Sequence, residues 1–208
     1  MKKLLSLVLS IIMLMSVVTA IPATAQAKSA SYTVATLKAS KKTLNKKAKK
    51  LYLKKINKLK NKGYDVMYCI KDITGDKIVD LILDYHTYLD GSGDTFNIYT
   101  YKSGKVKCIL KYGQYGMNYL HYYKKSKGLV MYCSGHGHES YTYIKYSGGK
   151  FKTVAQRGRM SVNGGNDYNG EWVYYIGKDL TYEATKSEFN AAKKTAIKGS
   201  KTNITFKY

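Results

Sequence analysis

Beyond residue 63 the chain repeats one local pattern, in which two short segments rich in tyrosine and β-branched residues flank a turn that contains glycine. Such segments favour extended strands, and glycine in the turns favours antiparallel hairpins. Earlier in the same region, a strand, a turn and a second strand are expected within 64–83. The expected hairpins join 97–102 to 105–110, 119–124 to 129–133, 141–146 to 150–155, and 172–176 to 180–184.

This pattern predicts an α+β protein that is mainly β. The expected fold is an antiparallel β-meander, curled or propeller-like, with an N-terminal amphipathic helix and a short C-terminal helix. Thr185 and Glu188 have the spacing of a capping box, which places the C-terminal helix at 189–197. The expected organisation is a signal peptide at 1–27, a lysine-rich segment with the helix at 28–63, and a tyrosine-rich β domain at 64–208.

The first residues have the order of a secretory signal peptide. Lys2 and Lys3 precede an apolar stretch at 4–18, and small residues follow up to Ala27. The apolar stretch is shorter than the roughly 20 residues that span a bilayer. We therefore expect a secreted or extracellular protein, with association with the cell wall as the more specific expectation, and a mature chain without a transmembrane segment.

Charge is large and unevenly placed. The 208 residues include 36 Lys and Arg against 13 Asp and Glu, a formal net charge of +23, and no acidic residue precedes Asp65. The hydrophobic fraction of 44% excludes an acidic, solvating disordered chain. Three cysteines, Cys69, Cys108 and Cys133, close at most one disulfide, and the sequence does not choose the pair.

Residues 41–62 form one expected amphipathic helix, with Ser40 or Thr43 as its N-cap and Gly63 at its end. Lys55 intrudes on the apolar face and is expected to reach outward. The apolar face consists of Leu44, Ala48, Leu51, Tyr52, Ile56 and Leu59.

A row of lysines follows the opposite face of this helix at four-residue steps. The row, called the lysine row below, consists of Lys42, Lys46, Lys50, Lys54 and Lys58. It is either a solvated face that keeps the protein soluble or a binding site for a polyanion. Outside a bacterial cell the expected partner is an anionic cell-wall polymer or another anionic surface, with no specific nucleic acid.

Tyrosine is unusually frequent, with 22 residues in the chain. A tyrosine-rich face can bind glycan or peptide, because the ring stacks and the hydroxyl forms hydrogen bonds. The alternative is that strands simply favour such side chains. The sequence leaves both open and favours the second.

The segment between the first two expected strands has alternating oxygen donors. These are suited to calcium, which prefers oxygen ligands. The alternative is a turn whose aspartates accept hydrogen bonds from the backbone and pair with nearby lysines. The candidate ligands are Asp72, Thr74, Asp76, Asp80 and the carbonyl group of Ile78.

This loop resembles the Asp-x-Asp-Gly-Asp-Gly-x-x-Asp-Leu loop of FG-GAP/VCBS-type repeats, and it departs from it at Thr74 and Lys77. Thr74 replaces an acidic or amide residue, and Lys77 replaces glycine. The wider layout is similar to a group of small, exported, uncharacterised proteins of Gram-positive gut bacteria. That resemblance implies export and a single degenerate Asp loop, and it implies no activity.

A glycine-rich segment holds His136, His138 and Glu139, which are candidate zinc ligands on a bent loop. No catalytic residue is expected elsewhere. The sequence therefore predicts a non-enzymatic binding or structural protein that anionic wall polymer retains through the lysine row. The alternatives are a calcium-stabilised adhesion or assembly module and a metal-dependent hydrolase.

Overall fold

The structure, a computed structural model, describes residues 23–86, 94–114, 117–135, 137–162, 168–177, 180 and 182–208. The chain divides into two units, Met1–Thr43 and Leu44–Tyr208. Residues 1–22 of the predicted signal peptide lie outside the described residues. The first described element, helix α2 (Ala23–Lys60), contributes residues to both units.

The second unit is built mainly from antiparallel strands in two sheets, which confirms the predicted fold class. The smaller sheet has the order β1-β2-β3-β4, and the larger has the order β10-β9-β8-β7-β6-β5-β11. The strands are β1 (Asp65–Lys71), β2 (Asp80–His86), β3 (Asp94–Lys102), β4 (Lys105–Gln114), β5 (Met117–Tyr123), β6 (Gly128–Gly135), β7 (His138–Ser147), β8 (Lys150–Met160), β9 (Val173–Ile176), β10 (Tyr182–Glu183) and β11 (Lys201–Asn203).

All the predicted hairpins form between consecutive strands. At the turn ends of two of these hairpins, Lys102 pairs with Lys105 and Ser147 pairs with Lys150. The meander is interrupted between β4 and β5. The first four strands form one sheet, and the later strands form the other.

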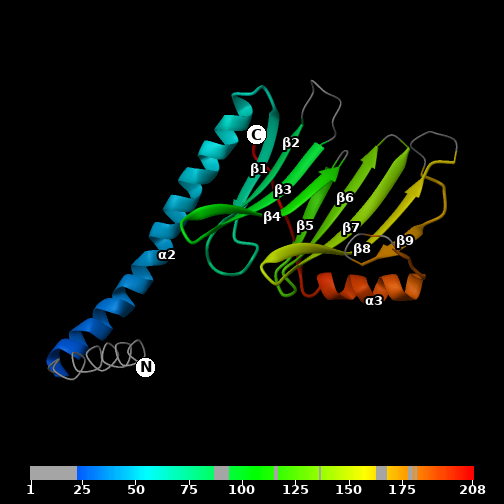
Figure 1. Ribbon diagram of the computed structural model, residues 1–208. Helices are drawn as coiled ribbons and strands as arrows, with labels where there is room; N and C mark the ends of the chain where they lie inside the picture. The colour runs from blue at the N-terminus through cyan, green and yellow to red at the C-terminus, as the bar shows by residue number, and fades with distance from the viewer. Residues whose placement is uncertain are drawn as a thin grey trace, which may run out of the picture. The chain divides into compact units, whose positions relative to one another are not determined.

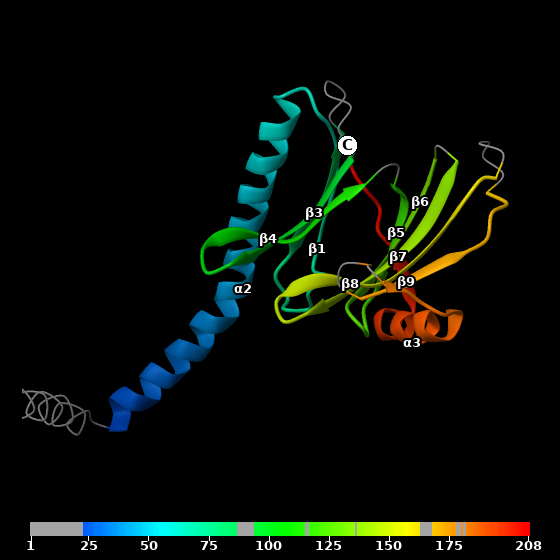
Figure 2. The same cartoon turned by 45° about the vertical axis from the view of Figure 1, so that its right-hand side comes forward.

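Three hydrophobic clusters arrange the second unit in layers (Figures 1 and 2). One cluster joins α2 to the smaller sheet and includes Tyr52 and Leu81. A second lies between the sheets and includes Ile82 and Met131. A third joins the larger sheet to helix α3 (Lys186–Ala196). The order is therefore helix, sheet, sheet, helix.

Strand β2 shows how sequence alternation produces these layers. Leu81 and Leu83 are fully buried against α2, whereas Ile82, which points to the opposite face, is fully buried between the sheets. Successive side chains on a strand point to opposite faces, so this strand is apolar on both.

The end of the chain connects the two sheets. The predicted capping box is present, because Thr185 and Glu188 bond each other's backbone amides at the start of α3. After α3, β11 pairs with β5 of the larger sheet. Lys207 then exchanges two backbone hydrogen bonds of 2.8 Å with Tyr68 on β1 of the smaller sheet.

The predicted helix at 41–62 is present but begins earlier. Helix α2 starts at Ala23 and includes Ser40 and Thr43, so neither residue caps it. Ala23 directly follows Pro22, the only proline of the chain, and no helix-breaking residue intervenes before Gly63. The predicted end is correct, since Gly63 adopts a left-handed φ of 81° just after the last turn.

One predicted core position on α2 is wrong. Leu51 keeps 38% of its surface exposed, whereas Ala48, Tyr52 and Ile56 are buried. These three residues are four apart and form a narrow stripe. Leu51 lies at the rim of that stripe, where the flat sheet no longer reaches it.

Candidate polyanion-binding site

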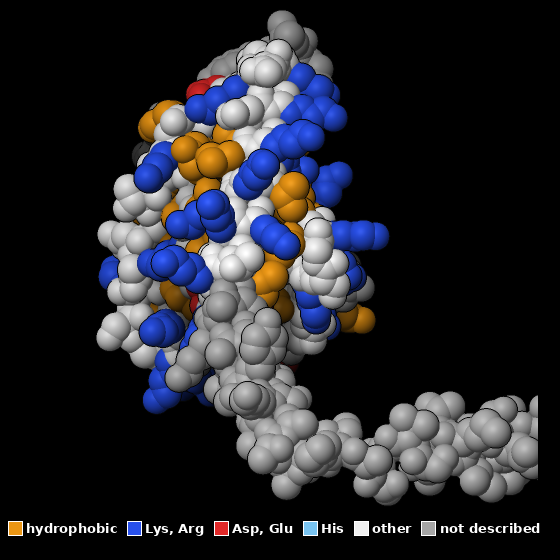
Figure 3. Space-filling model, turned by 90° about the vertical axis from the view of Figure 1, so that its left-hand side faces the viewer, with side chains coloured by type: hydrophobic (Ala, Val, Ile, Leu, Met, Phe, Trp, Pro, Cys, Tyr) orange, Lys and Arg blue, Asp and Glu red, His pale blue; other side chains and the backbone are white. Residues whose placement is uncertain are grey.

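The lysine row lies along the exposed face of α2. All five of its lysines are exposed, and so are Lys47, Lys49 and Lys60 on the same helix. A step of four residues advances about 6 Å along a helix, so the part of the row in the second unit, from Lys46 to Lys58, extends over about 18 Å. Figure 3 shows lysine and arginine side chains spread over this face, with hydrophobic side chains between them.

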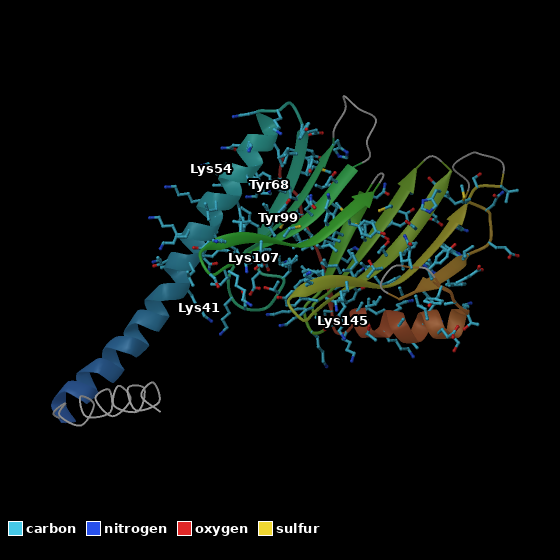
Figure 4. All side chains as sticks on the ribbon, in the orientation of Figure 1. Lys41, Lys54, Tyr68, Tyr99, Lys107 and Lys145 are labelled. Atoms are coloured by element: carbon cyan, nitrogen blue, oxygen red, sulfur yellow. The ribbon has the colours of Figure 1, made fainter. Side chains whose placement is uncertain are left out.

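The buried face of α2 fixes the direction in which the second half of the row points. The hydroxyl group of Tyr52 donates a 3.0 Å hydrogen bond to the carbonyl oxygen of Val79. Lys55, which was expected to reach outward, places its ammonium group 4.3 Å from the ring centroid of Tyr99. Figure 4 shows Lys54 on the side of the helix away from Tyr68 and Tyr99.

Asn45 is a further anchor that sequence reasoning missed. Its side-chain oxygen accepts a 2.8 Å hydrogen bond from the amide of Val79, and its side-chain nitrogen donates a 3.2 Å bond to the carbonyl oxygen of Lys77. The helix is thereby attached to the Asp loop between β1 and β2. A single asparagine on a helix gives no sequence signal for such a role.

No carboxylate on the helix neutralises the positive charge of the row. The first acidic residue of the chain is Asp65, which begins β1 after the helix has ended. Each like-charged pair at four-residue spacing costs about 0.2–0.5 kcal/mol. Burying Tyr52 and Ile56 contributes roughly 1.5–3 kcal/mol for each side chain, which offsets that repulsion.

The Asp loop uses its carboxylates to hold its own backbone. Asp72 accepts hydrogen bonds from the amides of Gly75 (2.7 Å) and Lys77 (2.9 Å), and Asp76 accepts one from Ile78 (2.7 Å). This is the arrangement of a turn in which aspartates accept backbone hydrogen bonds. It accounts for two of the predicted calcium ligands without an ion.

Asp80 differs from Asp72 and Asp76 because it is fully buried. One of its oxygens accepts 3.0 Å hydrogen bonds from the amides of Ile73 and Thr74. Burial raises the pKa of Asp80 to about 6, against the lowering effect of these hydrogen bonds. Within the described part of the chain, no group of three or more His, Cys, Asp or Glu side chains could hold a metal ion, and bound calcium stays a prediction.

The structure does not show the three predicted zinc ligands gathered in one site. His136 lies outside the described residues. His138 is exposed and lines a cavity of about 480 Å³ beside Gly158 and Tyr175. The carboxylate of Glu139 is already bound, by the guanidinium group of Arg159 and by the Tyr132 hydroxyl group at 3.0 Å.

All three cysteines are free thiols. Burial raises the pKa of Cys69 and of Cys108, so both thiols stay protonated at neutral pH. Protonated thiols are weak nucleophiles.

Replacing Lys77 with glycine should stabilise the protein. Lys77 has a left-handed φ of 70°, a conformation that costs a lysine roughly 1–2 kcal/mol, and it stands where the repeat motif has glycine. Because glycine also gains entropy when unfolded, we expect a net gain of about 0.5–1 kcal/mol in the free energy of unfolding. Urea denaturation measures it. The turn residue Lys124, whose φ is not positive, is the control, and its replacement by glycine should give no gain.

A comparison with known protein families, with curated proteins and with solved structures finds no match to this chain. Among the described residues, no helix is both long enough and apolar enough to cross a membrane.

Proposed function

We propose that this protein is a secreted or cell-surface-associated, non-enzymatic binding protein that anionic cell-wall polymer retains through the lysine row. The observation that carries the proposal is the exposure of Lys46, Lys50, Lys54 and Lys58 in line on the part of α2 that belongs to the second unit, with no carboxylate among them. Lysine ammonium groups attract phosphate or carboxylate groups at a distance without requiring a fixed geometry. A flexible polymer with repeating charges suits such a row.

The anchored face of the helix supports this proposal. Tyr52, Ile56 and Asn45 hold the helix on the smaller sheet, so the helix backbone that carries the lysines does not have to order itself when a polymer binds. Preorganisation of this kind lowers the entropic cost of binding. The proposal of export rests on the sequence of the first 27 residues.

The test is retention of the mature chain on isolated Gram-positive cell walls at rising salt. Replacing Lys46, Lys50, Lys54 and Lys58 together with glutamine should reduce retention at low salt at least tenfold. Each lysine near an anionic surface contributes about 1 kcal/mol to binding, so the loss of four lysines can weaken binding by up to about 4 kcal/mol, which is well above a tenfold change. The wild-type protein should elute as the salt concentration increases, because screening weakens exposed ionic contacts.

A matched control removes the same charge elsewhere. Lys102, Lys124, Lys152 and Lys186 are exposed and scattered over β3, the β5–β6 turn, β8 and α3. Their joint replacement by glutamine should leave retention near that of wild type. Equal loss in the two quadruple variants would mean that total charge, and not the lysine row, retains the protein. Walls stripped of their anionic polymer should retain neither the wild type nor the control.

A further inference from the structure

The larger sheet has an outer face that α3 covers at one end of its strands (Figures 1 and 2). Phe189 of α3 is buried there against Tyr143 and Tyr174, with ring centroids 5.6 and 5.0 Å away. Side chains two residues further along each strand lie on the same face, beyond this contact. They form a second row beyond Phe189, and of its members only Tyr141 also packs against the cluster that joins α3 to the sheet.

We call this second row the tyrosine row, and it consists of Tyr119, Tyr132, Tyr141 and Arg157. The sheet register places each of these residues directly opposite the next, on β5, β6, β7 and β8. The ring centroids are 4.8 Å apart between Tyr119 and Tyr132, and 4.7 Å apart between Tyr132 and Tyr141. These distances match the spacing of neighbouring strands, so the rings contact one another across the sheet, stacked between Tyr119 and Tyr132 and tilted between Tyr132 and Tyr141.

Stacking determines what the tyrosine row presents to solvent. The rings of Tyr119 and Tyr132 cover one another's flat faces, whereas the Tyr141 ring is tilted by 44° from that of Tyr132. Ring edges and hydroxyl groups therefore lie along the middle of the row. Tyr119 keeps 37% of its surface exposed, and Tyr132 and Tyr141 are half-buried. Burial raises the pKa of the Tyr119 hydroxyl group, which therefore stays a hydrogen-bond donor at neutral pH. The row offers a line of hydroxyl groups on the middle of a sheet, of which that of Tyr132 already donates to Glu139 and keeps only its acceptor capacity for a ligand.

Two guanidinium groups lie at the end of the row. Arg157 lies 4.6 Å from the ring centroid of Tyr141 and 4.3 Å from that of Trp172, and Arg159 lies 4.7 Å from that of Trp172. Arg159 is neutralised by Glu139. Among the described residues no carboxylate pairs with Arg157, and its Nε is buried without an acceptor.

We propose that the tyrosine row with Arg157 binds a saccharide that carries an acidic group. Sugar hydroxyl groups match the phenol hydroxyl groups, and one carboxylate or phosphate matches the unpaired guanidinium, which binds such groups in a planar, two-pronged geometry. An extended peptide fits this place poorly, because peptides add to the open edges of sheets and this row crosses the middle of one. The site is separate from the lysine row and does not rest on the function proposed for it.

Trp172 is the only tryptophan of the chain, so its fluorescence reports this site alone. The experiment titrates the full mature chain with a uronic-acid tetrasaccharide in about 0.5 M sodium chloride, which shortens the screening length to about 4–5 Å and suppresses binding by exposed lysines. We expect saturable quenching of Trp172. Replacing Arg157 with glutamine should weaken binding about tenfold or more, since it removes a charge-assisted hydrogen bond.

The matched control is Lys152→Gln, which removes one positive charge from an exposed position on the same strand and should change the affinity less than twofold. Tyr141→Phe removes one hydroxyl group of the row and leaves the bond between Tyr132 and Glu139 in place. An approximately threefold loss of affinity is expected even if the Arg157 variant does not fold. Three comparison probes complete the test. The carboxyl-reduced tetrasaccharide, inorganic polyphosphate and a polyglutamate peptide should all bind more weakly. No quenching by the uronic-acid probe, or equal affinity for any of these three, would overturn the proposal.

Discussion

Replacing Gly128 with alanine is expected to destabilise the protein by about 3 kcal/mol or more. A Cβ atom at this position would overlap the carbonyl oxygen of Ala196 and lie 2.7 Å from its carbonyl carbon. Both are backbone atoms of α3, which cannot yield as a flexible side chain would. Overpacking of a rigid contact typically costs 1–3 kcal/mol, and here the docking of α3 is lost in addition. Urea denaturation, followed by far-ultraviolet circular dichroism, measures the change.

The local contacts explain why this junction leaves no space. Ser126 donates a hydrogen bond to the same carbonyl group of Ala196 and accepts a 3.1 Å bond from the amide of Lys198. These bonds fix the end of α3 on the β5–β6 turn. Gly104→Ala is the control, because Gly104 has a positive φ of 78° but no atom near its missing side chain. It should cost only about 1 kcal/mol, and an equal cost at Gly128 would contradict the interpretation.

Replacing Asp80 with asparagine should raise stability at pH 7.5 in calcium-free buffer. The folded-state pKa of about 6 is above the ordinary value of 3.8, so the folded protein binds the proton more tightly than the unfolded chain does. Wild-type stability should therefore fall as the pH rises from about 4 to 6.5. At pH 7.5 the two-unit difference corresponds to at most about 3 kcal/mol. Asparagine keeps an oxygen for the amides of Ile73 and Thr74, so we expect a gain of about 1–3 kcal/mol.

The measurement is a set of thermal melting curves from pH 4 to pH 8 for both proteins. The variant should lose the decline that wild type shows with rising pH. The exposed loop residue Asp76 provides a matched control, and Asp76→Asn should keep that decline. A wild-type curve that is flat over this range would refute the prediction. Added calcium should raise the wild-type melting temperature if the predicted ligands bind the ion, and identical curves in calcium and in chelator would exclude it.

The parts of the fold that could be predicted from sequence are those with short-range signals. The β3–β4 and β7–β8 turns contain glycine, and the Thr185–Glu188 pair has the spacing of a capping box. The start of α2 was predicted wrongly because Ser40 and Thr43 are typical caps that a helix also tolerates in its interior. The strand β11 carries no strand-like pattern and exists only because β5 offers it an open edge.

The candidate sites divide in the same way. The lysine row follows from helical periodicity, which the sequence displays directly. The tyrosine row depends on which residues of four strands lie opposite one another and on how far α3 extends. Neither the strand register nor the extent of α3 follows from a local sequence pattern, so the sequence does not single out Arg157 and Trp172. High tyrosine content was visible, but the stacking that turns ring faces toward each other was not.

The backbone contact between Lys207 and Tyr68 makes the last residues of the chain close its first strand. Tyr68 and Lys207 are 139 positions apart in the sequence, so this contact closes a very long loop. Before it forms, β1 lacks this backbone partner. Contacts between such distant parts of a sequence form slowly. The pairing of β1 with the segment after β11 is therefore expected among the last steps of folding.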